Sequence, residues 1–426
     1  MTSIERAFRP IKVIDIELGD RLSPLTGLQP YTAVHALVRL HGTPLELVRV
    51  PVKGGVCSAT TIRRAILGTL AGSILVGKVH DALDAGLGRA RPDDAPERPP
   101  APLPSVTVAV CTRNRPDDLA RCLAAVERLE HPDLEVVVVD NSPSTEQTRE
   151  LVESRFPKIR YVREPRPGLD WARNRAIAEA RGEVIAFTDD DVVVDPGWAL
   201  ALASVFAMDD GVMAVTGLVV PLELETHAQM LFERSGGFGR GFHRTWYRLS
   251  DEVNPSFHLG PGKFGTGANM AFRSTIFEEV GAFDTALGAG TATNGGDDLE
   301  MFFRVLQEGH VLVYEPAAVV RHRHRRDYES LRVQLSDHGL ALYAFIVRSA
   351  RAYPELRGLF IRFGVWWLWR RSLRRLLISY LRPSRMPRDL IIAELRGSLI
   401  GLTRYGSAKR EAARIARSEP LLEVAT

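Results

Sequence analysis

The sequence predicts an α/β protein built around a mainly parallel β-sheet with helices on both faces. Predominantly apolar, strand-like runs occupy residues 106–111, 134–139 and 184–187, and they alternate with helical patterns. Strands buried on both faces read as continuous apolar runs, and their alternation with helices is typical of parallel sheets. Polar clusters follow all three runs directly, which is where such sheets bind ligands.

Turn and helix signals predict the remaining elements of this region. Pro116 suits the first turn of a helix over residues 116–129, whose inward face carries Leu119, Cys122 and Val126. We expect further helices over residues 145–156 and 170–181 and from Asp297 onward, and further strands over residues 159–162 and 311–314.

A chain of 426 residues is long enough for two or three domains of about 150 residues each. Near the N-terminus, strand-like runs over residues 31–40 and 45–52 flank a turn at His41 and Gly42, and a helical pattern follows over residues 58–83. This part carries no catalytic constellation, so we assign it no role. The expected parts are a small α+β domain (1–88), a Pro-rich linker (89–104), the α/β domain (105–330) and a helical, basic C-terminal region (331–426).

Composition favours a cytoplasmic protein. Cys57, Cys111 and Cys122 fit neither a disulfide framework nor a zinc-binding spacing, which favours a reducing compartment. The first ten residues have no apolar signal core, and no run reaches the roughly 18 uninterrupted apolar residues of a spanning helix. We expect a location in the cytoplasm, where the basic tail could contact the inner face of the cell membrane.

Three consecutive carboxylates, Asp189, Asp190 and Asp191, follow the strand at residues 184–187. They repel one another, and each is costly to remove from water. A solvated acidic turn could carry them, but at the end of a core strand a bound cation explains them better. Carboxylate ligands suit Mg²⁺ or Mn²⁺, which usually keep a phosphate as a further ligand.

Several motifs in order give the chain a recognisable pattern, and together they resemble the family 2 glycosyltransferases. That family has the GT-A fold, a Rossmann-like mixed sheet, and the resemblance covers about residues 105–330. The motifs are Val-Ala-Val-Cys-Thr-Arg-Asn-Arg-Pro (108–116), Val-Val-Val-Val-Asp-Asn-Ser (136–142), Ala-Arg-Asn-Arg-Ala-Ile-Ala-Glu-Ala-Arg-Gly (172–182), Phe-Thr-Asp-Asp-Asp (187–191), Gly-Thr-Gly-Ala-Asn-Met-Ala-Phe-Arg (265–273), Gly-Ala-Phe-Asp (281–284) and Gly-Gly-Asp-Asp-Leu-Glu-Met-Phe-Phe-Arg (295–304).

The resemblance implies a metal site at the aspartates. Asp189 and Asp191 are the outer members of what looks like the family's D-x-D motif, and Asp191 is our choice of direct ligand. Asp190 is expected to contact the metal or a ribose, although three adjacent aspartates leave the register open by one residue. In the basic run at residues 321–326, His324 is chosen over His322 to complete the metal shell. As a bare patch, the run could instead bind nucleic acid or anionic lipid, but in this setting we expect no nucleic acid partner.

The resemblance also implies a nucleotide site. Asp140 looks like the family's base-binding aspartate, and its alternative is a turn residue. Thr112, Arg113 and Asn114 are expected to contact base and ribose, or to cap the following helix. Arg173 could reach a phosphate, or it could be a surface arginine.

The segment at residues 295–304 implies a catalytic base. By resemblance we choose Asp298 as the base and Asp297 as the residue that positions the acceptor; the family usually has Glu at the first place. Acidic residues at a helix N-terminus also occur simply because they suit its dipole. A base that acts opposite the leaving group predicts inversion at the anomeric carbon.

Two segments outside these motifs carry weaker signals. The Gly-rich residues 225–262 predict a mobile lid or acceptor loop, or a flexible insertion. Residues 360–381 combine Trp366, Trp367, Trp369 and Tyr380 with arginines, as interfacial amphipathic helices do, although a helix packed on the α/β domain would also fit.

The expected function is that of an inverting glycosyltransferase that uses Mn²⁺ or Mg²⁺. Its donor would be a UDP-, TDP- or GDP-sugar, and its acceptor a hydroxyl of a glycan, a lipid-linked glycan or a small molecule. The motif Gln-x-x-Arg-Trp of processive synthases is absent from the sequence, which favours the transfer of single sugars. A nucleotidyltransferase, or a non-catalytic basic-tailed binding protein on the same scaffold, remains the alternative.

Overall fold

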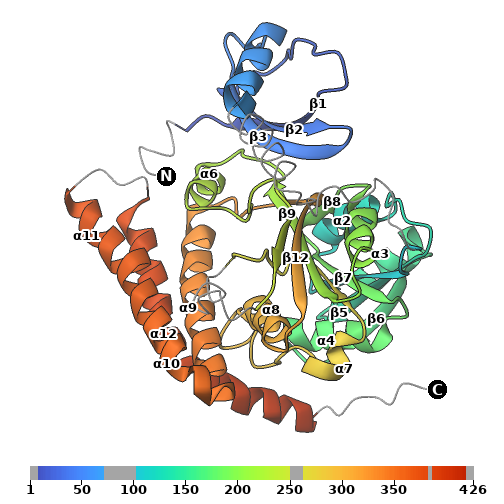
Figure 1. Cartoon of the computed structure of the whole chain (residues 1–426), viewed down its shortest axis with the longest axis vertical. Coiled ribbons are helices and arrows are strands. Elements are labelled where there is room, and N and C mark those ends of the chain that lie inside the picture. Colours follow the sequence, from blue (N-terminus) through green and yellow to red (C-terminus); the bar gives the residue numbers. More distant parts are fainter. Residues whose placement is uncertain (1–7, 72–101, 250–261, 382–385, 419–426) are drawn as a thin grey trace, which may run out of the picture.

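The structure is a computed structural model, and it describes residues 8–71, 102–249, 262–381 and 386–418. It shows an N-terminal sheet, a central α/β domain and a C-terminal layer of long helices (Figure 1). Most of the expected linker and the second half of the helix expected over residues 58–83 lie outside the described residues.

The central sheet is mixed, and half of it is parallel as expected. Its strands follow the order β10-β12-β9-β11-β7-β4-β5-β6, and β8 pairs with β12 beside this row. The parallel half consists of β4 (Val106–Thr112), β5 (Leu134–Asn141), β6 (Arg160–Glu164) and β7 (Val184–Asp189). The other strands are β8 (Val192–Val194), β9 (Val212–Pro221), β10 (Thr245–Tyr247), β11 (Asn269–Arg273) and β12 (Val311–His322).

Helices cover both faces of this sheet, as the apolar strands required. One buried cluster joins the sheet to α2 (Pro116–Val126), α3 (Gln147–Arg155) and α5 (Trp198–Phe206). A second cluster joins its other face to α4 (Leu169–Glu179), α7 (Ile276–Val280) and α8 (Asp297–Gln307). Every residue of β4 is buried, which explains why all its residues except Thr107 and Thr112 are apolar.

Strand register brings the polar clusters to one edge. Thr112 stands opposite Asp140 in the pairing of β4 with β5, and Cys111 stands opposite Asp189 in the pairing of β4 with β7. The turns after all three strands therefore meet, as the sequence predicted.

The N-terminal part is a three-stranded sheet with its own core. The strand β1 (Ile11–Glu17), which we did not predict, pairs in parallel with β2 (Ala33–Leu40), and β3 (Thr43–Pro51) is antiparallel to β2. Residues 59–71 are helical and pack on this sheet. Arg39 of β2 fixes the sheet to the α/β domain, because its guanidinium contacts Asp15 at 3.0 Å and Asp195 at 2.7 Å.

The C-terminal region is helical in its described part, and it packs on the α/β domain. The helix α9 lies against the α/β domain, and α12 runs along its outer side (Figure 1). None of the described helices is long and apolar enough to cross a membrane. The elements are α9 (Tyr328–Ala352), the short η3 (Pro354–Leu356), α10 (Arg357–Trp367), a π-helical turn η4 (Leu368–Leu373), α11 (Arg374–Leu381) and α12 (Arg388–Ser418).

Two segments differ from the sequence-based expectation. The Gly-rich stretch at residues 225–262 contains the helix α6 (His227–Arg234), which a capping box between Thr226 and Gln229 begins, as well as β10. It is therefore not a plain loop, although residues 250–261 lie outside the described chain. The strand predicted over residues 311–314 is also longer: β12 continues to His322, so the basic run begins on a strand.

Candidate active site

The turn after β4 holds the middle aspartate in place. The Thr112 hydroxyl donates to Asp190 Oδ2 over 2.8 Å, and Arg115 Nη1 lies 3.1 Å from Asp190 Oδ1. Arg115 also lies 3.5 Å from Asp191 Oδ2. Sequence reasoning did not select Arg115, although it belongs to the same cluster as Thr112. Thus Asp190 is already satisfied by the protein, which leaves its neighbours more free to meet a ligand.

The histidine beside the aspartates is His322. The distance from its Nε2 to Asp191 Oδ1 is 3.4 Å. The cause is local pairing: β8 begins one residue after Asp191, and its Val192 stands opposite His322 in β12. His324, our choice from the sequence, turns away and contacts Glu233 Oε1 through its Nε2 at 2.8 Å. Its Nδ1 meets His322 Nδ1 at 3.0 Å, so His324 supports His322 from behind.

The donor atoms near Asp191 fit a divalent cation that relies on its substrate for further ligands. In the described ranges, no three His, Cys, Asp or Glu side chains gather as a complete metal shell. Asp191 and His322 supply two neighbouring donors, and Mg²⁺ or Mn²⁺ commonly takes few protein ligands with phosphate oxygens completing the shell. Burial, and then the charge of Asp191, raise the pKa of Asp189 to about 7, because both disfavour a further negative charge here. A cation would relieve this repulsion.

The predicted nucleoside contacts lie further along the same edge. Asp140 is 0% exposed; its Oδ2 accepts a hydrogen bond from the Tyr161 hydroxyl at 3.0 Å, whereas its Oδ1 has no hydrogen-bond partner in the described chain. Burial raises the pKa of Asp140. Arg113 and Asn114 are exposed, and Asn114 Oδ1 accepts hydrogen bonds from the backbone and hydroxyl of Ser144, both at 3.0 Å.

Arg173 is buried, so it is not the surface arginine that the sequence allowed. Its guanidinium forms an ion pair with Asp297, lies 3.4 Å from Asp170 Oδ1, and covers the ring of Phe283 at 5.3 Å. Arg173 thus neutralises the carboxylate beside Asp298.

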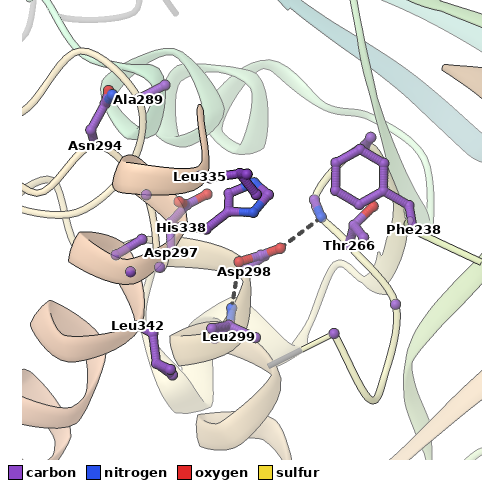
Figure 2. Close-up of a pocket in the computed structure, with 18 of the residues that line it drawn as sticks. Phe238, Thr266, Ala289, Asn294, Asp297, Asp298, Leu299, Leu335, His338 and Leu342 are labelled. Carbon is purple, nitrogen blue, oxygen red and sulfur yellow. Dashed lines mark hydrogen bonds between the residues drawn. The ribbon is translucent and has the colours of Figure 1, made fainter. Parts of the chain in front are cut away.

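Asp298 stands at the start of α8 and faces the cavity in Figure 2. Its Oδ2 accepts from the Gly267 backbone N–H at 2.9 Å, and its Oδ1 from that of Leu299 at 2.8 Å. Burial, and then the charge of Asp297, raise its pKa to about 6. Gly296 precedes α8 with φ 90°, and a Cβ there would stand 2.7 Å from the Ala341 carbonyl oxygen. The glycine therefore allows α8 to begin against α9.

A cavity of about 500 Å³ connects these groups. Its lining includes Asp189, His322 and Asp298. The helix α9 also borders the cavity, with Leu335, His338 and Leu342, and Figure 2 shows His338 next to Asp298. Of the predicted residues, Arg173, Asp189, Asp297 and Asp298 line this cavity, whereas Thr112, Arg113, Asn114, Asp140, Asp190, Asp191 and His324 are not among its lining residues.

The lining also includes residues that the sequence analysis did not choose. His322 was weighed there, but His324 was preferred to it. Arg240 lies in the Gly-rich segment and His338 in α9, and both line the cavity. Neither stands in a motif, so no local signal marked them.

Comparisons with known proteins agree with the geometry. The family model "Glycosyl transferase family 2" matches residues 107–281. The chain is 25% identical over 226 residues to the glucosyl-dolichyl phosphate glucuronosyltransferase of Haloferax volcanii, covering 51% of this chain and 69% of that protein. It is 30% identical over 222 residues to the succinoglycan biosynthesis protein ExoM of Rhizobium meliloti, covering 50% of this chain and 65% of that protein.

Among solved structures, the chain is similar to a mannosyltransferase from Pyrobaculum calidifontis in complex with GDP-Man and Mn²⁺. The identity is 20%, the TM-score is 0.42, and the match covers 84% of this chain and 88% of that one. The family match extends from the start of β4 to the end of α7, so it includes Asp189, Asp190 and Asp191 but neither β12 nor Asp298. Residues 107–281, the larger part of the α/β region, thus match glycosyl transferase family 2.

Proposed function

We propose that the protein is an inverting, metal-dependent glycosyltransferase that moves a sugar from a nucleoside-diphosphate donor to a hydroxyl group. One observation carries this proposal: Asp298 lies in the same cavity as Asp189 and His322. A carboxylate and a cation site that share one cavity match what the reaction needs, namely a base for the acceptor and a counter-charge for the leaving diphosphate.

Asp298 is the base in this proposal. Two backbone N–H groups orient its carboxylate, and a pKa of about 6 lets it accept a proton near neutral pH. Arg173 offsets the charge of Asp297, so Asp297 and Arg173 position the site rather than exchange the proton. Attack from the side of Asp298, opposite the diphosphate, would invert the anomeric carbon.

Asp191 and His322 are the proposed protein ligands of Mn²⁺ or Mg²⁺, with Asp189 beside them. The bound cation would neutralise the charge that develops on the departing diphosphate. We propose His322 in place of His324 because only His322 lies beside Asp191. Asp140, with Thr112, Arg113 and Asn114 next to it, would hold the nucleoside of a UDP-, GDP- or TDP-sugar.

We propose that the acceptor enters from the side of α9. We also propose that the protein works at the inner face of the cell membrane. Trp366, Trp369 and Tyr380 are exposed in the C-terminal helices, so their aromatic rings are free to enter a headgroup layer. One relative, from Haloferax volcanii, is a glucosyl-dolichyl phosphate glucuronosyltransferase, which is compatible with such a location. Glycosyl transfer is favoured over nucleotidyl transfer because the family match covers the nucleotide side of the site.

A donor panel tests the proposal. The full chain is incubated with Mn²⁺ and with UDP-, GDP- and TDP-sugars, while nucleoside diphosphate release and the thermal shift are measured. We expect one nucleotide to raise the melting temperature in the presence of Mn²⁺, and its sugar to be hydrolysed or transferred. Asp191→Asn should lose the Mn²⁺-dependent part of the shift. If no donor gave nucleoside diphosphate release or a thermal shift, the enzymatic function would be contradicted. If the protein instead released pyrophosphate from a nucleoside triphosphate and a sugar phosphate, a nucleotidyltransferase would be favoured.

A further inference from the structure

Behind the candidate cation site, the side chains of Glu233, His324 and His322 lie in one line of contacts, which we call the histidine network. His322 Nδ1 lies 3.0 Å from His324 Nδ1, and His324 Nε2 lies 2.8 Å from Glu233 Oε1. The other ring nitrogen of His322, Nε2, faces Asp191 Oδ1 at 3.4 Å. The network therefore connects the end of α6 to the nitrogen that would meet the cation.

Aromatic packing holds both imidazoles of the network in place. His324 is 2% exposed and His322 is 8% exposed. The ring of Phe238 packs edge-on against that of His322 with centroids 5.1 Å apart, and the ring of Phe232 lies 4.7 Å from that of His324. Both imidazoles are thus largely shielded from water, so their nitrogens must find partners among neighbouring protein groups.

The carboxylate of Glu233 ends the network, and a glycine leaves room for it. Gly237 has φ 46°, and a Cβ there would stand 2.7 Å from Glu233 Oε1. The side chain of Glu233 is 21% exposed, and it interacts electrostatically with Arg240. Such surroundings suit an ionised carboxylate, which accepts hydrogen bonds and donates none.

These contacts fix the positions of the protons one after another. Because Glu233 can only accept, His324 carries a proton on Nε2. A neutral imidazole has a single N–H, so His324 Nδ1 is an acceptor and His322 donates to it from Nδ1. His322 then has no proton on Nε2, and the lone pair of this nitrogen faces Asp191.

A second arrangement of protons would satisfy the same contacts, but it fits the geometry less well. His324 would carry protons on both nitrogens, and His322 would donate from Nε2 to Asp191. This would place a positive charge on a side chain that is 2% exposed, which is costly. The 3.4 Å between His322 Nε2 and Asp191 Oδ1 is also longer than a good hydrogen bond. The first arrangement is therefore favoured.

We propose that Glu233 and His324 are positioning residues, which hold His322 as the tautomer whose Nε2 can bind Mn²⁺ or Mg²⁺. This inference rests on the proposed function, because His322 is a proposed ligand there. Hydrogen bonds to the second nitrogen of a ligand histidine fix its tautomer and its ring orientation, and their loss typically costs 10–100-fold in metal affinity. Here Glu233 acts on His322 only through a second imidazole.

Two substitutions of His324 separate this role from simple packing. Mn²⁺ is titrated calorimetrically into the full chain in the presence of UDP, GDP or TDP. We expect His324→Phe to lower the Mn²⁺ affinity by about tenfold or more, because a phenyl ring cannot accept from His322. His324→Asn places an amide oxygen near the position of Nδ1, so its Mn²⁺ affinity should stay closer to that of the wild type.

A role in packing alone predicts the reverse order of the two variants. Phe would fill the space beside Phe232 and Phe238, whereas Asn would leave part of it empty. Glu233→Leu should weaken Mn²⁺ binding as His324→Phe does, and an unchanged affinity would overturn the role of Glu233. The matched control is His310→Phe: His310 contacts Glu279 Oε2 at 2.8 Å but does not line the cavity, so Mn²⁺ binding should not change.

The tautomer itself can be measured on the wild type without metal or nucleotide. Nitrogen-15 spectra of the histidine side chains distinguish a ring nitrogen with a proton from one without, and His322→Gln identifies the signals of His322. We expect the proton on Nδ1. A proton on Nε2, or a lower Mn²⁺ affinity in His324→Asn than in His324→Phe, would overturn the proposal. If the wild type binds no Mn²⁺ with any of the three nucleotides, the metal site of the proposed function fails, whereas the spectra still decide the tautomer.

Discussion

The contact between α9 and α12 makes a quantitative prediction, because three glycines allow the two backbones to touch. A Cβ at Gly397 would stand 1.8 Å from the Ser336 carbonyl oxygen, and one at Gly401 would stand 2.4 Å from that of Leu340. At Gly339 the distance to the Glu394 carbonyl oxygen would be 2.2 Å. Substitution of Gly397 by Ala therefore forces the helices apart, and α12 carries Glu394 of the cavity wall with it.

Two opposing effects set the magnitude for Gly397→Ala. In a helix interior, alanine is favoured over glycine by about 1 kcal/mol. Overpacking of a tight contact costs typically 1–3 kcal/mol, and here the clash is with backbone that cannot rotate away. We expect a net loss of about 2 kcal/mol in the free energy of unfolding. The matched control is Gly358→Ala in α10, where a Cβ would meet no atom within 4 Å and should stabilise the helix by up to about 1 kcal/mol.

Differential scanning calorimetry measures both variants against the wild type. For a cooperative unit of about 200 residues, 1 kcal/mol corresponds to roughly 2–4 °C in the melting temperature. We therefore expect a lower melting temperature for Gly397→Ala and an unchanged or higher one for Gly358→Ala. If Gly397→Ala were as stable as Gly358→Ala, the backbone contact between α9 and α12 could not be as tight as the structure has it.

Three further predictions concern the site and its support. Burial raises the pKa of Asp298 to about 6. We therefore expect kcat/KM to be constant at higher pH and to fall as the pH drops through about 6, where the base becomes protonated. A kcat/KM profile that stays flat down to pH 5 would exclude Asp298 as the base. His322→Ala should weaken Mn²⁺ binding in the presence of nucleotide by about tenfold or more by calorimetry, because it removes a proposed ligand, and an unchanged affinity would exclude it. Arg39→Ala should lower the free energy of unfolding by about 1–3 kcal/mol in thermal scans, because it removes the ion pair that joins Asp195 to the N-terminal sheet, whereas Asp15 keeps its ion pair with Arg321. No change would show that the ion pair of Arg39 with Asp195 is not stabilising.

The parallel half of the sheet was predictable because burial on both faces leaves a direct trace in the sequence. The strands β4, β5 and β7 fall where their apolar runs predicted them. Their shared edge then follows from the rules of parallel pairing, so the meeting of Thr112, Asp140 and Asp189 was predictable too. The choice of Asp298 as base came only from the resemblance, and it stays a prediction.

What the sequence did not reveal depends on contacts between distant segments. The position of His322 is set by the pairing of β8 with β12, two strands that lie more than a hundred residues apart. Sequence alone offered His322 and His324 as near equals, and only this register separates them. Likewise, His338 reaches the cavity because α9 packs against the start of α8 at Gly296. Packing between segments that are distant in the chain leaves no periodic pattern in the local sequence.

The central claim, that Asp298 is the base in a site whose cation lies elsewhere in the cavity, is tested by one comparison. Asp298→Asn preserves the size of the side chain and an oxygen that can accept from Gly267 N–H. The account predicts that Asp298→Asn binds nucleotide with Mn²⁺ as the wild type does, by calorimetry, while its sugar transfer falls by about 10²–10⁴-fold. Transfer at the wild-type rate, or loss of nucleotide binding together with transfer, would contradict it.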